Sequence, residues 1–128
     1  MKVLLDTHAF LWFAADDLRL SSVARATVED PANDAYLSLA SVWERAIKVS
    51  LGKLRLKANV KDFVTDKLGK SDIDLLVIDL AHVAKVADLP LHHRDPFDRL
   101  LFAQCLVMEM PLISRDPAAQ LYGVHRIW

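Results

Sequence analysis

Short apolar runs alternate along the chain with longer stretches in which apolar residues recur at helical spacing. A short apolar run bounded by polar residues is typical of a buried strand, and alternating strands and helices are typical of a parallel sheet. Five runs are predicted to be strands: Lys2–Leu5, Ala35–Ser38, Leu75–Ile78, Leu112–Ser114 and Val124–Ile127. Six stretches are predicted to be helices: Thr7–Ala15, Ser21–Glu29, Ser41–Leu51, Val60–Leu68, Leu80–Ala87 and Pro96–Met108.

These elements predict an α/β fold with three layers, in which helices cover both faces of a central five-stranded parallel sheet. Parallel strands need crossover connections, and right-handed crossovers place helices on both faces. Gly52 follows Leu51 and is expected to end a helix in the left-handed conformation. The chain has only 3 Gly and 5 Pro in 128 residues, so no flexible linker divides it. We therefore expect one domain over residues 1–128.

The composition narrows the class of protein. Hydrophobic residues make up 53% of the chain, which excludes disorder, and no apolar stretch approaches the roughly 18 residues of a membrane span. Asp6 comes too early for a secretory leader. Cys105, the single cysteine, lies in an apolar run and is expected to be a core thiol. We expect a cytoplasmic protein without a membrane segment.

The charge balance bears on any nucleic-acid partner. The chain has 16 basic and 17 acidic residues, which gives a formal net charge of −1. Proteins that bind nucleic acids usually carry a positive excess. A role on nucleic acid would therefore depend on a local basic cluster or on bound cations.

Acidic residues follow the predicted strands at the ends where an α/β sheet binds its ligands. Asp6 follows the first strand, and Glu44 lies early in the helix after the second. Asp95 and Asp98 open the helix that leads into the fourth strand, and Asp116 follows that strand. Parallel strands bring these positions to one edge of the sheet, so we expect the acids to converge.

Each acid also has a purely structural interpretation. Asp6, Asp95 and Asp116 are suited to be helix N-caps, and proline follows the last two, as it commonly does at the first helical position. Ser41 and Glu44 have the spacing of a capping box.

Taken together, the acids favour a metal site. Converging carboxylates repel one another unless a cation is bound or some of them are protonated. Mg²⁺ prefers carboxylate, water and phosphate oxygens, and a pair of ions about 4 Å apart can activate a water and stabilise the leaving oxygen of a phosphodiester. No zinc-type Cys/His spacing, Gly-rich phosphate loop or GxSxG motif competes with this interpretation.

A basic segment begins beside Glu44. The stretch from Arg45 to Lys61 contains six basic residues and no acid. Its first members are candidates for contacts to an RNA backbone, namely Arg45, Lys48, Lys53 and Arg55. A simple solvated helix face is the alternative.

Some aromatic residues on predicted helices lie at core-like positions, namely Phe10, Trp12, Phe13 and Trp43. Core packing is expected for most of them, and a surplus could line a groove for a partner.

Several motifs resemble a VapC-like subgroup of the PIN-domain family. They follow one another over essentially the whole chain: Leu4-Leu5-Asp6-Thr7-His8-Ala9, Ser41-Val42-Trp43-Glu44, Leu51-Gly52-Lys53-Leu54, His93-Arg94-Asp95-Pro96-Phe97-Asp98-Arg99-Leu100-Leu101 and Ser114-Arg115-Asp116-Pro117. The block around Asp98 is the most specific of these. Arg45 and Ala119 depart from the subgroup, which would have an apolar and an aromatic residue there.

The resemblance implies a sheet of order 3-2-1-4-5 and an endoribonuclease toxin that depends on Mg²⁺, with Mn²⁺ as a substitute. It also implies a cognate antitoxin that blocks the active-site groove, and we expect a homodimer. Asp6, Glu44 and Asp98 match the core acids, and Asp116 matches the fourth polar position. Asp95 belongs to the subgroup motif but is not assigned as a ligand. Ser114 matches the family's hydroxyl residue two positions before the fourth polar position.

Other α/β folds with acids at strand ends fit less well. A two-component receiver domain needs an acid pair after the first strand, and a HAD-type phosphatase needs an aspartate two residues after Asp6, where His8 stands. The alternative that the sequence leaves open is a catalytically inactive PIN fold that serves as an RNA- or protein-binding module.

Overall fold

The computed structural model describes all residues from Met1 to Trp128. Five strands form one sheet in the order β3-β2-β1-β4-β5, and every neighbouring pair is parallel. The strands are β1 (Lys2–Leu5), β2 (Asp34–Ser38), β3 (Ile73–Leu76), β4 (Leu112–Ile113) and β5 (Arg126–Ile127). The α/β class and the strand order are thereby confirmed.

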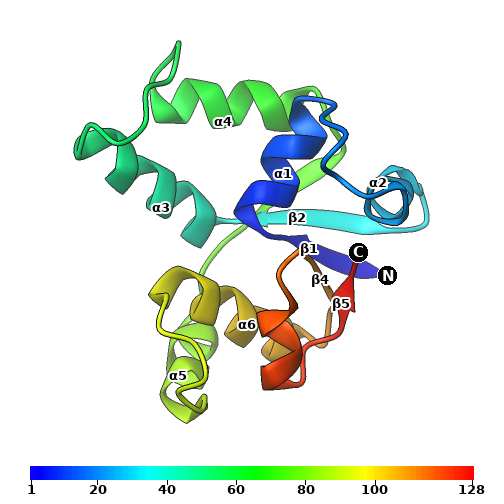
Figure 1. The fold of residues 1–128 in the computed structure, drawn as a ribbon, viewed down its shortest axis with the longest axis vertical. Coiled ribbons are helices and arrows are strands. Elements are labelled where there is room, and N and C mark those ends of the chain that lie inside the picture. The colour runs from blue at the N-terminus through cyan, green and yellow to red at the C-terminus, as the bar shows by residue number, and fades with distance from the viewer.

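Helices cover both faces of this sheet. They are α1 (Thr7–Ala14), α2 (Ser22–Glu29), α3 (Leu39–Ser50), α4 (Val60–Gly69), α5 (Leu80–Asp88), α6 (Pro96–Met108) and the 3₁₀ helix η1 (Pro117–Tyr122). Figure 1 shows α1, α2 and α4 on one side of the strands and α5 and α6 on the other, with the two termini side by side. None of these helices is long and apolar enough to cross a lipid bilayer.

Two apolar cores result from the alternation of side chains along β1. Leu4 packs in one cluster with α6 and η1, whereas Val3 and Leu5 pack in the other with α1, α2 and α4. This is the three-layer arrangement that the sequence predicts. Cys105 is 2% exposed, and burial raises the pKa of its thiol to about 12. The prediction of a core thiol is confirmed.

The third strand is displaced from its predicted place. The apolar run predicts a strand at Leu75–Ile78, whereas β3 spans Ile73–Leu76, so that prediction is wrong. β3 is an edge strand that pairs only with β2, and its last pair joins Leu76 to Ser38. Since α3 begins at the next residue after Ser38, no partner remains for a longer strand.

The start of α3 also differs from the prediction. The helix begins at Leu39, and the Oγ of its N-cap Ser38 accepts a hydrogen bond from the Ala40 amide at 3.0 Å. The predicted capping box of Ser41 and Glu44 is therefore wrong, because both residues lie inside the helix. The Ser41 hydroxyl is buried without a hydrogen-bond partner, and Glu44 has no capping role.

Smaller differences concern the C-terminal third and Trp43. The strands β4 and β5 are shorter than predicted, and η1 is a helix that the pattern did not predict. Trp43 is 56% exposed, so it is not a core residue, whereas Phe10 is buried as expected. Gly52 has φ +70°, and the Lys53 amide bonds to the Lys48 carbonyl, which confirms the helix stop.

A buried polar network joins the helices that carry the candidate acids. The Ser38 hydroxyl donates to Oε1 of Gln104 at 2.6 Å, and Gln104 is fully buried in α6. The Gln104 amide donates to the Val77 carbonyl at 3.2 Å and lies 3.3 Å from Nδ1 of His82 in α5. Because buried polar groups are costly when unpaired, this network fixes the start of α3 against α6.

Candidate active site

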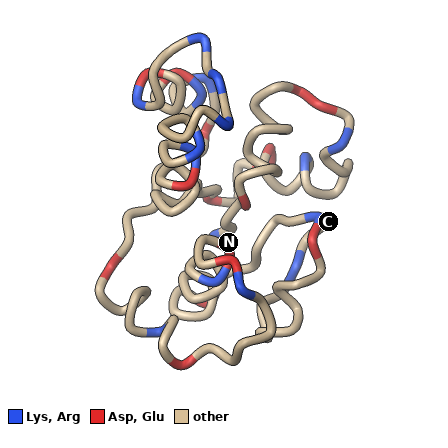
Figure 2. The backbone as a smooth tube through the Cα atoms, turned by 60° about the vertical axis from the view of Figure 1, so that its left-hand side comes forward, with Lys and Arg blue, Asp and Glu red and all other residues tan.

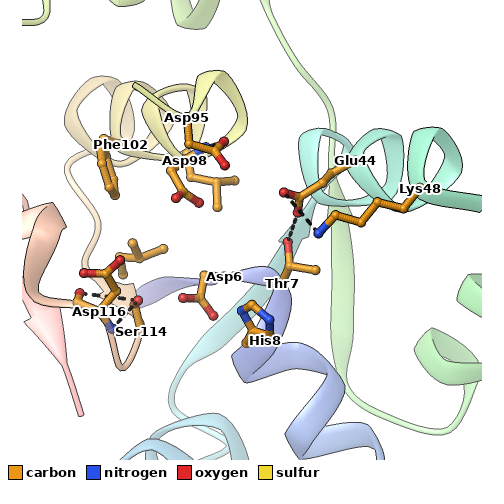
Figure 3. Close-up of a pocket in the computed structure, with 12 residues that line it drawn as sticks. Asp6, Thr7, His8, Glu44, Lys48, Asp95, Asp98, Phe102, Ser114 and Asp116 are labelled. Atoms are coloured by element: carbon orange, nitrogen blue, oxygen red, sulfur yellow. Dashed lines mark hydrogen bonds and ion pairs between the residues drawn. The ribbon is translucent and has the colours of Figure 1, made fainter. Parts of the chain in front are cut away.

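A pocket of about 210 Å³ lies at the carboxyl end of the sheet. The acids that line it come from four separate segments: Asp6, Glu44, Asp95, Asp98 and Asp116. In Figure 3, Asp6 lies between the acids of α6 and Asp116 on one side and Glu44 of α3 on the other. The structure thus brings together all the acids that the sequence singles out.

Asp6 occupies the junction between β1 and α1. Its Oδ1 accepts a hydrogen bond from the Ala9 amide at 2.8 Å, so the residue is an N-cap as predicted. Burial raises the pKa of Asp6 above its ordinary value, and the nearby Asp116 carboxylate acts in the same direction. The Ser114 hydroxyl, the Ala9 amide and His8 oppose this rise in pKa. Asp6 is therefore a carboxylate whose charge is poorly compensated.

Glu44 reaches the pocket from the middle of α3. Its Oε1 accepts a hydrogen bond from the Thr7 hydroxyl at 3.1 Å, and Oε2 lies 3.9 Å from the ammonium group of Lys48. Lys48 is the only lysine or arginine that lines the pocket. These two contacts orient Glu44 and offset part of its charge.

Asp95 and Asp98 have different surroundings at the start of α6. Oδ1 of Asp95 accepts hydrogen bonds from the amides of Phe97 (2.8 Å) and Asp98 (3.1 Å), as expected of an N-cap. Asp98 instead contacts Nε2 of His93 through its Oδ2 at 2.8 Å.

Burial is also the main reason why the pKa of Asp98 is raised. The carboxylates of Asp95 and Glu44 raise it further, whereas the hydrogen bond with His93 opposes the rise. Like-charge repulsion thus acts across the pocket between α3 and α6.

Asp116 closes the far side of the pocket. It is the N-cap of η1, where its Oδ1 accepts from the Ala118 amide at 2.9 Å, and its own amide donates to the Ser114 hydroxyl at 3.1 Å. A carboxylate has two oxygens, so capping through one oxygen leaves the group able to face the pocket. Capping and ligand binding are therefore compatible at Asp6, Asp95 and Asp116.

The donor set suits a hydrated divalent cation better than a fully protein-bound one. All the acids present oxygen ligands, which Mg²⁺ and Mn²⁺ prefer. No three acidic, histidine or cysteine side chains are arranged to hold one ion by themselves. Mg²⁺ commonly keeps several waters and uses only one or two carboxylates, so the residues present fit such an ion.

The four basic candidates do not form one surface. Lys48 lines the acid pocket, whereas Arg45 lines a separate cavity of about 410 Å³ between α1 and α4. Lys53 and Arg55 are exposed in the segment that joins α3 to α4. Figure 2 shows blue basic positions gathered in the upper left of the molecule, with red acidic positions among them.

Comparison with known proteins decides the family. The PIN domain family model matches residues 3–123, which is nearly the whole chain. The chain belongs to the PIN-domain family. A curated relative, Ribonuclease VapC16 of Mycobacterium tuberculosis, is 40% identical over 60 residues, which cover 47% of this chain and 43% of that protein. The match thus spans less than half the length of this relative.

Solved structures support the same fold. A VapBC2 complex from Rickettsia felis, crystallised with a promoter DNA fragment, aligns with a TM-score of 0.69, with 13% identity and 100% of both chains covered. FitAcB from Neisseria gonorrhoeae aligns with a TM-score of 0.66 and 19% identity, over 97% of this chain and 95% of the other. At these identities the similarity establishes the PIN-type fold alone.

Two contacts of this PIN domain were not foreseen from the sequence. Thr7 and His93 each bond to a candidate acid, Glu44 and Asp98 respectively. Both residues belong to the motifs that resemble the family, so the sequence marked them as notable but did not indicate what they contact. Partners 37 residues apart in the chain, such as Thr7 and Glu44, cannot be paired by local spacing.

The raised pKa of Asp6 makes a prediction about the metal-free protein. A carboxyl group whose pKa is higher in the folded than in the unfolded state lowers the free energy of unfolding at pH values above its folded pKa. This destabilisation disappears as the pH falls toward the pKa of the unfolded state. The free energy of unfolding in EDTA should therefore decrease as pH rises from about 4 through the folded pKa. Asp6→Asn should flatten this decrease and be at least as stable as wild type at pH 7.

Urea denaturation over a pH series measures this effect. Asp72→Asn, an exposed change at the amino end of β3, should leave the pH dependence as in wild type. If the free energy of unfolding changes with pH equally in Asp6→Asn and wild type, the charge of Asp6 does not destabilise the fold.

Proposed function

We propose that this PIN-domain protein is a Mg²⁺-dependent endoribonuclease that hydrolyses RNA phosphodiester bonds and serves as the toxin of a toxin–antitoxin pair. The observation that carries the proposal is the convergence of acids from four chain segments in one pocket. The name of the relative Ribonuclease VapC16 and the similarity to VapBC2 and FitAcB structures support the same class.

In this proposal Asp6, Glu44, Asp98 and Asp116 are the metal ligands and catalytic acids. Mg²⁺ is the proposed ion, and Mn²⁺ would replace it because it accepts the same oxygen ligands. Divalent cations bound here would supply an activated water and stabilisation of the leaving oxygen. The pocket volume of about 210 Å³ leaves room for water beside an ion, since one water takes about 30 Å³ in the liquid.

The residues around the acids have supporting roles in the proposal. The Thr7 hydroxyl orients Glu44, and Lys48 limits repulsion between Glu44 and the other acids. Lys48 is also near enough to the acids to attract an incoming phosphate group. Metal ions would let a chain with a formal net charge of −1 approach an anionic backbone.

The basic residues away from the pocket are proposed to contact the RNA backbone. Lys53 and Arg55 are exposed, and neither has an acidic partner within ion-pair distance. Arg45 is half-buried beside the cavity between α1 and α4, and its Nε has no hydrogen-bond partner. Such unpaired cations are suited to contact phosphate groups. These contacts would strengthen binding to RNA of any sequence.

The proposed partners are RNA, a cognate antitoxin and a second copy of the chain. The antitoxin is supported by the neighbouring structures, which include a toxin–antitoxin complex from Klebsiella pneumoniae with a TM-score of 0.58. All five strands lie in one sheet, which supports one domain over residues 1–128. The competing function, an inactive PIN fold that only binds RNA or protein, would keep this fold without needing the acids.

Asp95 and Asp98 are expected to differ in their effect on cleavage. Asn caps a helix about as well as Asp, so Asp95→Asn should change stability little and retain most activity. Asp98→Asn exchanges a charged oxygen ligand for a neutral amide and should lower the cleavage rate by several orders of magnitude. The measurement is the rate of RNA cleavage at saturating Mg²⁺. An inactive Asp95→Asn beside an active Asp98→Asn would reverse the proposed ligand assignment.

The proposed contacts to the RNA backbone predict how the affinity for RNA depends on salt concentration. Replacing Lys53 and Arg55 by Gln should weaken binding of all single-stranded RNAs and reduce the slope of log affinity against log salt by about 0.7 per lost contact. A filter-binding series in EDTA measures this without cleavage. Lys2→Gln with Lys70→Gln removes the same charge at the amino end of the sheet and should keep the wild-type slope. If the two double variants behave alike, the segment is only a solvated surface.

A further inference from the structure

His93 contacts a candidate acid but does not line the pocket itself. It lies between α5 and α6, and its Nε2 is 2.8 Å from Oδ2 of Asp98. When Asp98 is ionised, Nε2 donates this hydrogen bond, because a carboxylate oxygen can only accept. The other oxygen, Oδ1 of Asp98, makes no hydrogen bond, while the Asp98 side chain lines the pocket. One oxygen is thus held and the other is left available.

His93 is itself anchored to a different part of the chain. Its amide donates a hydrogen bond to the hydroxyl of Tyr122 at 2.7 Å, and its ring lies 6.1 Å from that of Phe102, between ring centroids. Tyr122 is 8% exposed and packs on Phe102 at 5.0 Å. Tyr122 belongs to η1, whose N-cap is Asp116. A continuous chain of contacts therefore runs from Asp98 through His93 to the helix that Asp116 caps.

A direct chemical role does not fit the position of His93. The residues that line the pocket include Asp98 and Phe102 but not His93. A group that transfers a proton to substrate must come within hydrogen-bond reach of it. His93 meets the site only through Asp98.

We propose that His93 is a positioning residue that holds the Asp98 carboxylate in the orientation needed to bind a divalent cation. The inference rests on the proposed function, because it concerns the same metal site. A ligating carboxylate that is hydrogen-bonded from behind keeps its orientation, and loss of such a partner typically costs about 10- to 100-fold in metal affinity. Without His93, Asp98 would lose the contact that holds one of its oxygens.

The test is the affinity of RNA-free protein for Mn²⁺, measured from the electron paramagnetic resonance signal of the unbound ion. His93→Ala should bind Mn²⁺ about 10- to 100-fold more weakly than wild type. His93→Gln should stay within a few-fold, because the glutamine amide can donate a hydrogen bond from a position near that of Nε2. His92→Ala is the matched control, since His92 is exposed and touches Tyr122 but no acid.

A double-variant cycle separates positioning from a general structural role. In an Asp98→Asn background, His93→Ala should cause no further loss of Mn²⁺ affinity, because the residue through which it acts is already altered. Near-UV circular dichroism checks that the variants are folded. If His93→Ala does not fold, His93→Phe replaces it in the test, because it keeps the ring contact with Phe102 but lacks the hydrogen-bond donor. His93→Phe should then bind Mn²⁺ as weakly as is expected of His93→Ala.

The outcomes are distinct. If folded His93→Ala or His93→Phe binds Mn²⁺ as tightly as wild type, the role of His93 is overturned and the metal site is unaffected. An undiminished loss in the Asp98→Asn background also overturns it. A wild-type protein that binds no Mn²⁺ refutes the metal site, and with it both the proposed function and the role of His93.

Discussion

The gathering of partly buried carboxylates at one edge of the sheet is the constraint on which the rest of this structure depends. Parallel strands direct Asp6 and Asp116 to the same edge, and α3 and α6 add Glu44 and Asp98. Burial and mutual repulsion raise the pKa of Asp6 and of Asp98, so the metal-free pocket opposes folding at neutral pH. The proposed cation would offset the charge of these acids, and its binding would return the lost stability by mass action.

The scaffold around the pocket resists this repulsion through buried polar contacts rather than through counter-charges. Lys48 is the only lysine or arginine in the lining, and its 3.9 Å contact with Glu44 is loose. The Ser38–Gln104–His82 network holds α3 against α6, and Thr7 and His93 each hold one acid. Polar contacts orient the acids without neutralising them, which leaves their charge available to a metal. This division suits the proposed cation site.

Local signals explain which parts of the fold could be predicted from the sequence. α6 was predicted with the correct bounds because Asp95 and Pro96 mark its start and a long apolar pattern follows. β3 was misplaced because its bounds depend on its register against β2, which is a property of strand pairing. The start of α3 was misplaced although the end of β2 at Ser38 was predicted correctly, because the helix follows the strand without a loop. The acids could be grouped because the carboxyl ends of parallel strands meet at one edge of the sheet. Their partners could not, since Thr7 bonds across 37 residues and His93 needs the folded segment before α6.

The proposed metal-dependent cleavage can be measured by incubating purified protein with single-stranded RNA. We expect internal cleavage in Mg²⁺, its loss in EDTA, and its return when Mg²⁺ or Mn²⁺ is added in excess of the chelator. Asp6→Asn, purified in the same way, should remain inactive throughout and so excludes a contaminating nuclease. Cleavage that continues at the same rate in EDTA, or that Asp6→Asn retains in full, would contradict the account.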